Sequence, residues 1–282
     1  MFKTSNKLTS MLLGGIAMLG LNSCGIEPDN RFVEMEEVKP ERAVLLMDFT
    51  GQNCVNCPQA HEVMEELVNQ YGDKSLITVS IHAGALSIST DRTNFERERI
   101  GLMIQEGNEM NDAFGINSWP MGVVDRINAN GAAINTGQWA TAVRNALQQP
   151  TDIKIEAEAS LNGDNIEVSA RAICTSNRNA ALQVWVVEDG IIAQQVTPEG
   201  RKTDYVHNNV LRFVQYPVKE GKPLALDANV WAEDNCSIPV KYTDTERWNK
   251  ENLSIVAFVF EGTQILNTVR VKVSDGTTEE EE

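Results

Sequence analysis

Hydrophobic residues in the first half of the chain form short continuous runs separated by stretches with helical spacing. Runs of strand length occur at 43–49, 75–82 and 121–127, and such runs are typical of strands buried on both faces. Between the first two runs, apolar residues recur every three or four positions and predict one face of a helix that ends before Gly72: Ala60, Val63, Met64, Leu67, Val68 and Tyr71.

The alternation of predicted strands and helices continues to about residue 149. Helices are predicted over 95–114 and 137–147, and Asn130-Gly131 predicts a hairpin turn before a short strand at 132–134. The order of elements is therefore β-α-β-α-β-β-α, which is typical of an α/β domain.

After Pro150 the pattern changes to alternation with period two. Apolar residues alternate along 153–159 and again along 166–172, and Asn162-Gly163 lies between the two stretches, as expected for a hairpin. We predict an all-β, immunoglobulin-like sandwich for this block, with further strands at 181–187, 205–216, 253–260 and 264–273.

The amino terminus has the features of an export signal. Lys3 and Lys7 precede an apolar run, Met11 to Leu21, which is too short to cross a bilayer because a spanning helix needs about 20 residues. Leu21-Asn22-Ser23-Cys24 resembles the lipobox of bacterial lipoproteins. We therefore expect a signal peptide over 1–23, removed in the mature protein, and a lipid anchor on Cys24.

Length and composition set the domain plan and exclude some partners. A chain of 282 residues with 42% hydrophobic residues can form two globular domains, predicted at 42–150 and 151–275. An acidic tether over 24–41 and an acidic tail over 276–282 complete the plan. Lys and Arg number 24 against 40 Asp and Glu, a net charge of −16, which argues against nucleic acid as a partner.

The cysteine count divides into an anchor and two pairs. Besides Cys24, the chain has Cys54, Cys57, Cys174 and Cys236, and exported proteins commonly pair their cysteines. Cys174 continues the inward phase of its predicted strand. We therefore expect a structural disulfide between Cys174 and Cys236.

The Cys-x-x-Cys motif, Cys54 and Cys57, lies between a buried strand and an amphipathic helix. This position places both sulfurs in the first helical turn, where free amides and the helix dipole favour a thiolate. Cys54 is then the attacking nucleophile and Cys57 the resolving thiol. Asp48 is a charged residue within the buried strand, which favours a role in proton transfer. The redox-active disulfide itself would be the reactive group, without a further cofactor.

At several places the chain resembles the thioredoxin superfamily, over roughly residues 43–148. The stretch Met47 to Cys57 is similar to the family's strand and active-site turn, and Phe114 to Pro120 is similar to the run that ends in its cis-proline. The resemblance implies an α/β thioredoxin-like domain in which Asp48 takes the proton of Cys57. It also implies a cis Pro120 against the disulfide and a Trp119 backbone open to a substrate strand. Val55-Asn56 departs from the family's usual central dipeptides, so the direction of exchange stays open.

A closer resemblance covers the whole chain. The lipobox, Phe49 to Pro58 and Asp204 to Arg212 are together similar to the twenty-eight-kilodalton outer-membrane lipoproteins of Bacteroidetes, which pair a thioredoxin-like domain with a β-sandwich. The resemblance implies a lipid-anchored protein of the outer membrane. Its expected partners are protein thiols or disulfides of the cell envelope.

Other interpretations of the motif stay open. Cys54 and Cys57 could form an inert structural disulfide. With His61 and His82 they have the residue types of a copper or zinc site, although His61 also fits a solvated helix position. The functional alternative is a non-catalytic interaction or adhesion protein that binds its partner through the β-sandwich and uses the first domain as a scaffold.

Overall fold

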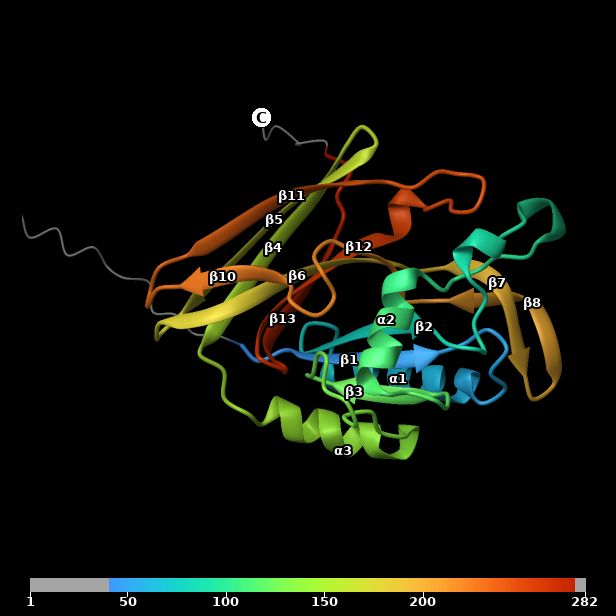
Figure 1. The fold of residues 1–282 in the computed structure, drawn as a ribbon, viewed down its shortest axis with the longest axis horizontal. Coiled ribbons are helices and arrows are strands. Elements are labelled where there is room, and N and C mark those ends of the chain that lie inside the picture. The colour runs from blue at the N-terminus through green and yellow to red at the C-terminus, as the bar shows by residue number, and fades with distance from the viewer. Residues whose placement is uncertain (1–40, 277–282) are drawn as a thin grey trace, which may run out of the picture. The chain divides into compact units, whose positions relative to one another are not determined.

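The computed structural model describes residues 41–276 (Figure 1). The sequence-predicted signal peptide, Cys24, most of the tether and all but the first residue of the tail lie outside these residues. Within them the chain forms thirteen strands and three α-helices. The elements are β1 (Val44–Thr50), α1 (Cys57–Tyr71), β2 (Leu76–His82), α2 (Gln105–Phe114), β3 (Met121–Val124), α3 (Thr136–Leu147), β4 (Ile153–Asn162), β5 (Asn165–Cys174), β6 (Arg178–Glu188), β7 (Ile191–Thr197), β8 (Gly200–His207), β9 (Val210–Val214), β10 (Lys222–Leu226), β11 (Ala232–Pro239), β12 (Leu253–Glu261) and β13 (Gln264–Lys272).

One large mixed sheet joins strands from both halves of the chain. Its order is β13-β12-β6-β9-β2-β1-β3, and β10 pairs with the first part of β6, Arg178 to Leu182. β1 and β2 are parallel, and β3 is antiparallel to β1. The two halves meet where β2 runs beside β9, and there the amide of Ser80 donates to the carbonyl of Asn209 at 2.7 Å.

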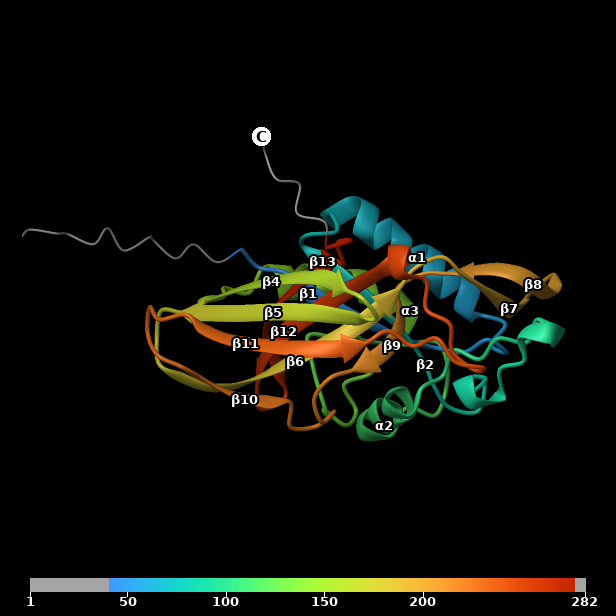
Figure 2. The same ribbon diagram turned by 90° about the horizontal axis from the view of Figure 1, so that it is seen from above.

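Helices cover both faces of the β1 end of this sheet. Val44 and Leu46 of β1 pack with α1 and α3, whereas Leu45, Met47 and Phe49 face α2. Figure 2 shows α1 and α2 on opposite sides of the strands. A strand covered on both faces needs apolar residues at consecutive positions, which explains its continuous hydrophobic run.

At the other end, the three-stranded sheet β11-β5-β4 packs against β6, β12 and β13. β6 contributes to two cores because its side chains alternate between the faces. Leu182 and Val184 point into the core shared with β4 and β5, whereas Trp185 and Val187 point into the core shared with β1 and β2.

The predicted fold class, an α/β thioredoxin-like domain followed by an all-β immunoglobulin-like sandwich, is wrong. The described chain is mostly β, and β1, β2 and β3 form one end of a sheet that continues into β9, β6, β12 and β13. The physical reason lies in β2 and β6, which have apolar residues on both faces and are paired on both edges. Hydrophobic periodicity reports which residues are buried but not which strands become neighbours.

Two predicted elements also differ in extent. The helix expected over 95–114 begins only at Gln105, because the preceding segment bends at Glu98 (φ 52°) and pairs Ser89 with Met103. The strand expected over 205–216 divides into β8 and β9 at Asn209 (φ 58°).

The predicted disulfide between Cys174 and Cys236 is absent, and both thiols are free. Cys236 in β11 lies opposite Val168 in β5, and Cys174 lies six residues further along β5. At about 3.4 Å per residue this separates the two cysteines by about 20 Å, whereas a disulfide needs Cα atoms within about 7 Å. Both cysteines lie in the correct sheet, but the register keeps them apart.

The helices of residues 41–276 include none with the length and apolar content required to cross a membrane.

Candidate functional site

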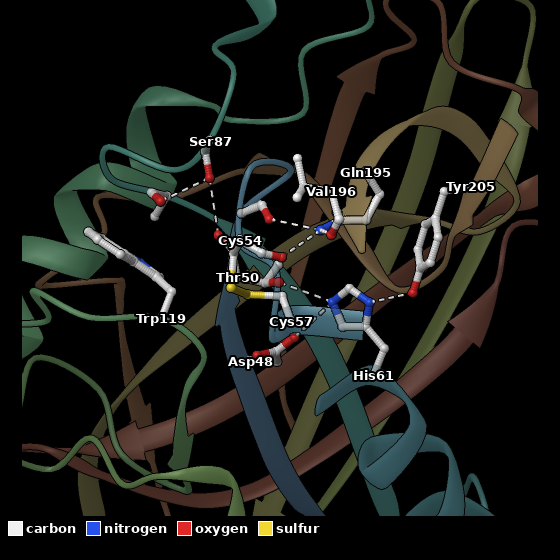
Figure 3. The surroundings of a disulfide bond; sticks show 12 residues. Asp48, Thr50, Cys54, Cys57, His61, Ser87, Trp119, Gln195, Val196 and Tyr205 are labelled. Carbon is white, nitrogen blue, oxygen red and sulfur yellow. Dashed lines mark hydrogen bonds and ion pairs between the residues drawn. A yellow bond between two sulfur atoms is a disulfide. The ribbon is translucent and has the colours of Figure 1, made fainter. Parts of the chain in front are cut away.

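The Cys54–Cys57 disulfide lies between the end of β1 and the start of α1 (Figure 3). Its Cα atoms are 5.4 Å apart. The turn begins at Gly51, where a Cβ atom would lie only 2.7 Å from the carbonyl oxygen of Leu86, so the chain needs glycine there. Pro58 occupies the first turn of α1, where its missing amide hydrogen costs no helical hydrogen bond.

The two sulfurs differ in position. Cys57 is the first residue of α1 and is fully buried, whereas Cys54 stands before the helix and is 3% exposed. The expectation that both cysteines lie in the first helical turn therefore holds for Cys57 alone. Cys54 is the more accessible of the pair, and its neighbour Val55 is 43% exposed.

A two-stranded ribbon, β7 and β8, holds the cysteine turn from the side. The buried Gln195 amide donates to the carbonyls of Gly51 at 3.2 Å and Cys54 at 3.0 Å. The Val196 amide donates to the carbonyl of Gln52 at 2.8 Å. These residues lie more than 140 positions beyond the turn, and sequence reasoning missed them. A glutamine in a short strand has no local signal of this role.

Gln52 ties the same turn to the loop before α2. Its side chain is fully buried; it donates to the carbonyl of Ile100 at 2.8 Å and accepts from the amide of Leu102 at 3.2 Å. Hydrogen bonds to the ribbon on one side and to the loop before α2 on the other therefore hold the turn in place.

Asp48 of β1 is fully buried in the sheet beneath this turn. Burial raises the pKa of its carboxyl above the ordinary value, and the nearby His61 opposes that rise. The Asp48 Oδ2 atom lies 3.3 Å from His61 Nε2, an ion-pair distance, and neither carboxyl oxygen has a partner of hydrogen-bond geometry among the described residues. Burial of this kind strengthens the binding of a proton by the carboxylate.

His61 connects Asp48 to the ribbon. Its Nε2 atom lies 3.0 Å from Thr50 Oγ1, and its Nδ1 atom lies 2.9 Å from the Tyr205 hydroxyl. Figure 3 shows the imidazole between Asp48 and Tyr205, on the side of the disulfide away from Trp119. His61 is therefore an ordered part of the site rather than a solvated helix residue, and Tyr205 is a member that sequence reasoning missed.

Trp119 lies on the other side of the disulfide, and a cis peptide bond joins it to Pro120. The indole Nε1 donates to Asn111 Oδ1 at 3.2 Å. The ring lies where a side chain on Gly84 would be, since a Cβ atom there would come within 1.9 Å of it. Trp119 is thus held by α2 and by the glycine after β2.

A cavity of about 290 Å³ opens beside His61 and Tyr205 and is also lined by His82 and His207. The His82 and His207 rings are 5.2 Å apart, and their nitrogens have no hydrogen-bond partner in the described part of the chain. Burial lowers the pKa of His82 well below its usual value, with electrostatic contributions from His207, His61 and Arg212 second. Burial also lowers the pKa of His207 to about 3, with a contribution from His61 second. Both imidazoles are neutral at pH 7.

The copper or zinc alternative named Cys54, Cys57, His61 and His82. Residues 41–276 contain no group of three or more histidine, cysteine or acidic side chains placed to hold a metal ion. The two sulfurs are joined to each other, and a metal would require them as thiolates.

Among solved structures, one protein has a similar fold over most of this chain. HBP35 of Porphyromonas gingivalis is similar with a TM-score of 0.65 and 14% identity, over 86% of this chain and 80% of that one. A domain of the outer membrane lipoprotein Omp28 from Porphyromonas gingivalis matches 46% of this chain and 93% of its own length, with 18% identity and a TM-score of 0.32. No curated protein sequence matches the chain.

The family model described as outer membrane protein Omp28 matches residues 107–277, more than half of the chain. The match confirms the resemblance inferred from the sequence and the location at the outer membrane. The chain belongs to the Omp28 family of outer membrane proteins.

Proposed function

We propose that this outer membrane protein carries out thiol–disulfide exchange with other proteins of the cell envelope through Cys54 and Cys57. The observation that carries the proposal is the disulfide at the start of α1 together with the buried Asp48 beneath it. Among the described residues this carboxyl has no hydrogen-bond partner and one ion-pair contact, with His61, to offset the cost of its burial. Buried ionisable groups with such incomplete compensation are concentrated at reactive sites.

The chemistry follows from the order of the two cysteines. In the reduced protein, the Cys54 thiolate attacks a substrate disulfide, forms a mixed disulfide and releases one substrate thiolate. Cys57 then gives its proton to Asp48 and attacks the Cys54 sulfur. The Cys54–Cys57 bond forms, the bond from Cys54 to the substrate breaks, and the second substrate thiolate leaves. The substrate gains two electrons, and the reverse sequence oxidises a substrate dithiol.

The test is reduction of a disulfide-containing protein such as insulin by the full chain in detergent, with dithiothreitol as electron source. Cys54→Ser removes the nucleophile and Cys236→Ser, a half-buried thiol outside the site, is the matched control. We expect wild type and Cys236→Ser to be equally active and Cys54→Ser to fall to the uncatalysed rate. A wild-type rate equal to that of Cys54→Ser would refute exchange and favour the alternative of a non-catalytic interaction protein.

Trapping identifies the substrates. In Cys57→Ser the mixed disulfide has no resolving thiol, so envelope proteins should accumulate on Cys54 and be released by reductant. The double variant lacking Cys54 as well is the control for adducts on Cys174 and Cys236.

A further inference from the structure

Exchange through Cys57 loads a proton onto a carboxyl that has no contact with solvent. Asp48 is 0% exposed, so the proton that it takes from Cys57 must leave through a neighbouring group before the next turnover. The neighbour within ion-pair distance of the carboxyl is His61, at 3.3 Å.

The two nitrogens of His61 face opposite ways along this route. Nε2 faces Asp48 and Thr50, and Nδ1 lies 2.9 Å from the Tyr205 hydroxyl. A neutral imidazole accepts a proton at one nitrogen and donates from the other. Proton transfer across the ring therefore requires no movement of the side chain.

The outer end of the route reaches open space. The His61 side chain is 16% exposed, and His61 and Tyr205 both line the cavity of about 290 Å³. A space of that size accommodates several water molecules, each occupying about 30 Å³. Besides His82 and His207, the charged or titratable groups that line it are Glu62 and Glu65 of α1, Asp73, and Arg270 of β13. Three of these four groups are acidic, which favours positive charge in the cavity.

The chain has three histidines, and all of them line this cavity. His82 and His207 lie deep in it, where burial keeps them neutral. Within the described part of the chain, His61 is the one of the three that lies at ion-pair distance from a carboxyl group.

We propose that His61 is a positioning residue that carries the proton between Asp48 and the cavity through its two ring nitrogens, with the Tyr205 hydroxyl as the outlet. The inference rests on the proposed exchange function. In the resolving step the Cys57 proton passes to Asp48, then to His61 Nε2, while the Nδ1 proton passes to Tyr205 and on to water. The substrate thiolate takes up one proton from solvent, so protons and electrons balance.

The test separates attack from resolution with a chromogenic aromatic disulfide, whose thiolate product is coloured. Mixed with the reduced full chain in detergent, it releases one coloured thiolate when Cys54 attacks and a second when Cys57 resolves. The variant Cys54→Ser, Cys57→Ser supplies the background from Cys174 and Cys236. His61→Ala should leave the first phase unchanged and slow the second on the order of a hundredfold, the lower end of what a positioned proton carrier contributes.

Added imidazole distinguishes a proton carrier from a structural support. In His61→Ala the missing ring leaves space beside the cavity, so free imidazole should restore the second phase in proportion to its concentration. His61→Gln can still hydrogen-bond but cannot carry the proton, and should be as slow as His61→Ala. Tyr205→Phe should slow the second phase less, because the imidazole still borders the cavity.

The outcomes separate the two proposals. A first phase in wild type combined with an unchanged second phase in His61→Ala overturns the relay and leaves exchange intact. A slow second phase that imidazole does not restore, or normal resolution in His61→Gln, overturns it as well. The absence of both phases in wild type, above the background variant, overturns exchange itself and with it the relay.

Discussion

At the residue scale, the buried carboxyl of Asp48 is central to the proposed exchange. Asp48 lies in a strand whose other residues are apolar except for Thr50, and its one ionic contact within residues 41–276 is with His61. Ionising an acid in such a place costs free energy because water is replaced by protein atoms that respond weakly to charge. The same cost makes Asp48 suited to hold a proton for part of a reaction cycle.

Replacing Asp48 with asparagine should stabilise the protein at neutral pH. Since burial raises the pKa of Asp48 above its ordinary value of 3.8, the folded state retains a proton that the unfolded chain has released. The stability linked to this group is therefore complete below about pH 4 and is lost as pH rises through the raised pKa. Asp48→Asn cannot ionise and avoids the loss.

Thermal unfolding of the full chain between about pH 4 and pH 8 measures this effect. The melting temperature of Asp48→Asn should exceed that of wild type near pH 7, and the difference should shrink toward pH 4. Asp275→Asn, an exposed carboxyl, is the control and should follow wild type throughout. A variant less stable than wild type at pH 7 would mean that the carboxylate is stabilising.

At the scale of elements, the ribbon of β7 and β8 does what neither strand could do alone. Isolated two-stranded ribbons are marginal in water, and this one is docked on the cysteine turn through Gln195 and Val196 and on His61 through Tyr205. Each contact gives a buried backbone carbonyl or imidazole nitrogen a partner. The ribbon and the turn therefore stabilise each other.

Gln195→Leu should loosen the cysteine turn. The substitution keeps the side-chain size but leaves the carbonyls of Gly51 and Cys54 without this donor, which costs about 1–3 kcal/mol for a buried acceptor. Chemical denaturation should show the loss, and limited proteolysis should cut the ribbon faster. Ile192→Ala on the same ribbon, at a side chain that is 64% exposed, should change neither. If Gln195→Leu and wild type were equally stable, Gln195 would not stabilise the cysteine turn.

The sequence predicts those helices and strands whose formation depends on residues close together in the chain. β1, α1, α3 and the β4–β5 hairpin follow from apolar spacing that neighbouring residues enforce. β7, β10 and β11 carry no clear pattern, because their burial depends on partners far away in the chain. The site divides in the same way: the positions of Asp48, Cys54 and Cys57 are local, whereas Gln195 and Tyr205 arrive through the pairing of distant strands.

For the whole molecule, the shared sheet is the decisive feature. On one face of β6, the Trp185 ring packs edge-on against Phe258, with 4.8 Å between the ring centroids. Leu182 lies on the other face. β6 therefore contributes side chains to both hydrophobic cores. Because the two halves share this strand, we expect them to unfold together in one cooperative transition.

Trp185→Ala should therefore weaken both halves at once. Removing a fully buried indole costs about 3–5 kcal/mol, and the chain should still unfold in one transition with a lower midpoint. Trp231→Ala is the control, because that ring is half-buried against Arg171 and its loss should cost far less. Two separate transitions, with one half unaffected by Trp185→Ala, would show that the halves are energetically independent.

The brace between Gln195 and the cysteine turn also constrains the timing of assembly. Export delivers the chain from its amino terminus, so Cys54 and Cys57 emerge long before the ribbon more than 140 residues later. Until then, the carbonyls of the turn lack the Gln195 amide that donates to them, and His61 lacks the Tyr205 hydroxyl. Contacts of such long sequence separation form late in folding. The proposed proton route can thus be complete only after the chain as far as Tyr205 has been delivered, so the cysteine turn gains its last hydrogen-bond partners late in folding.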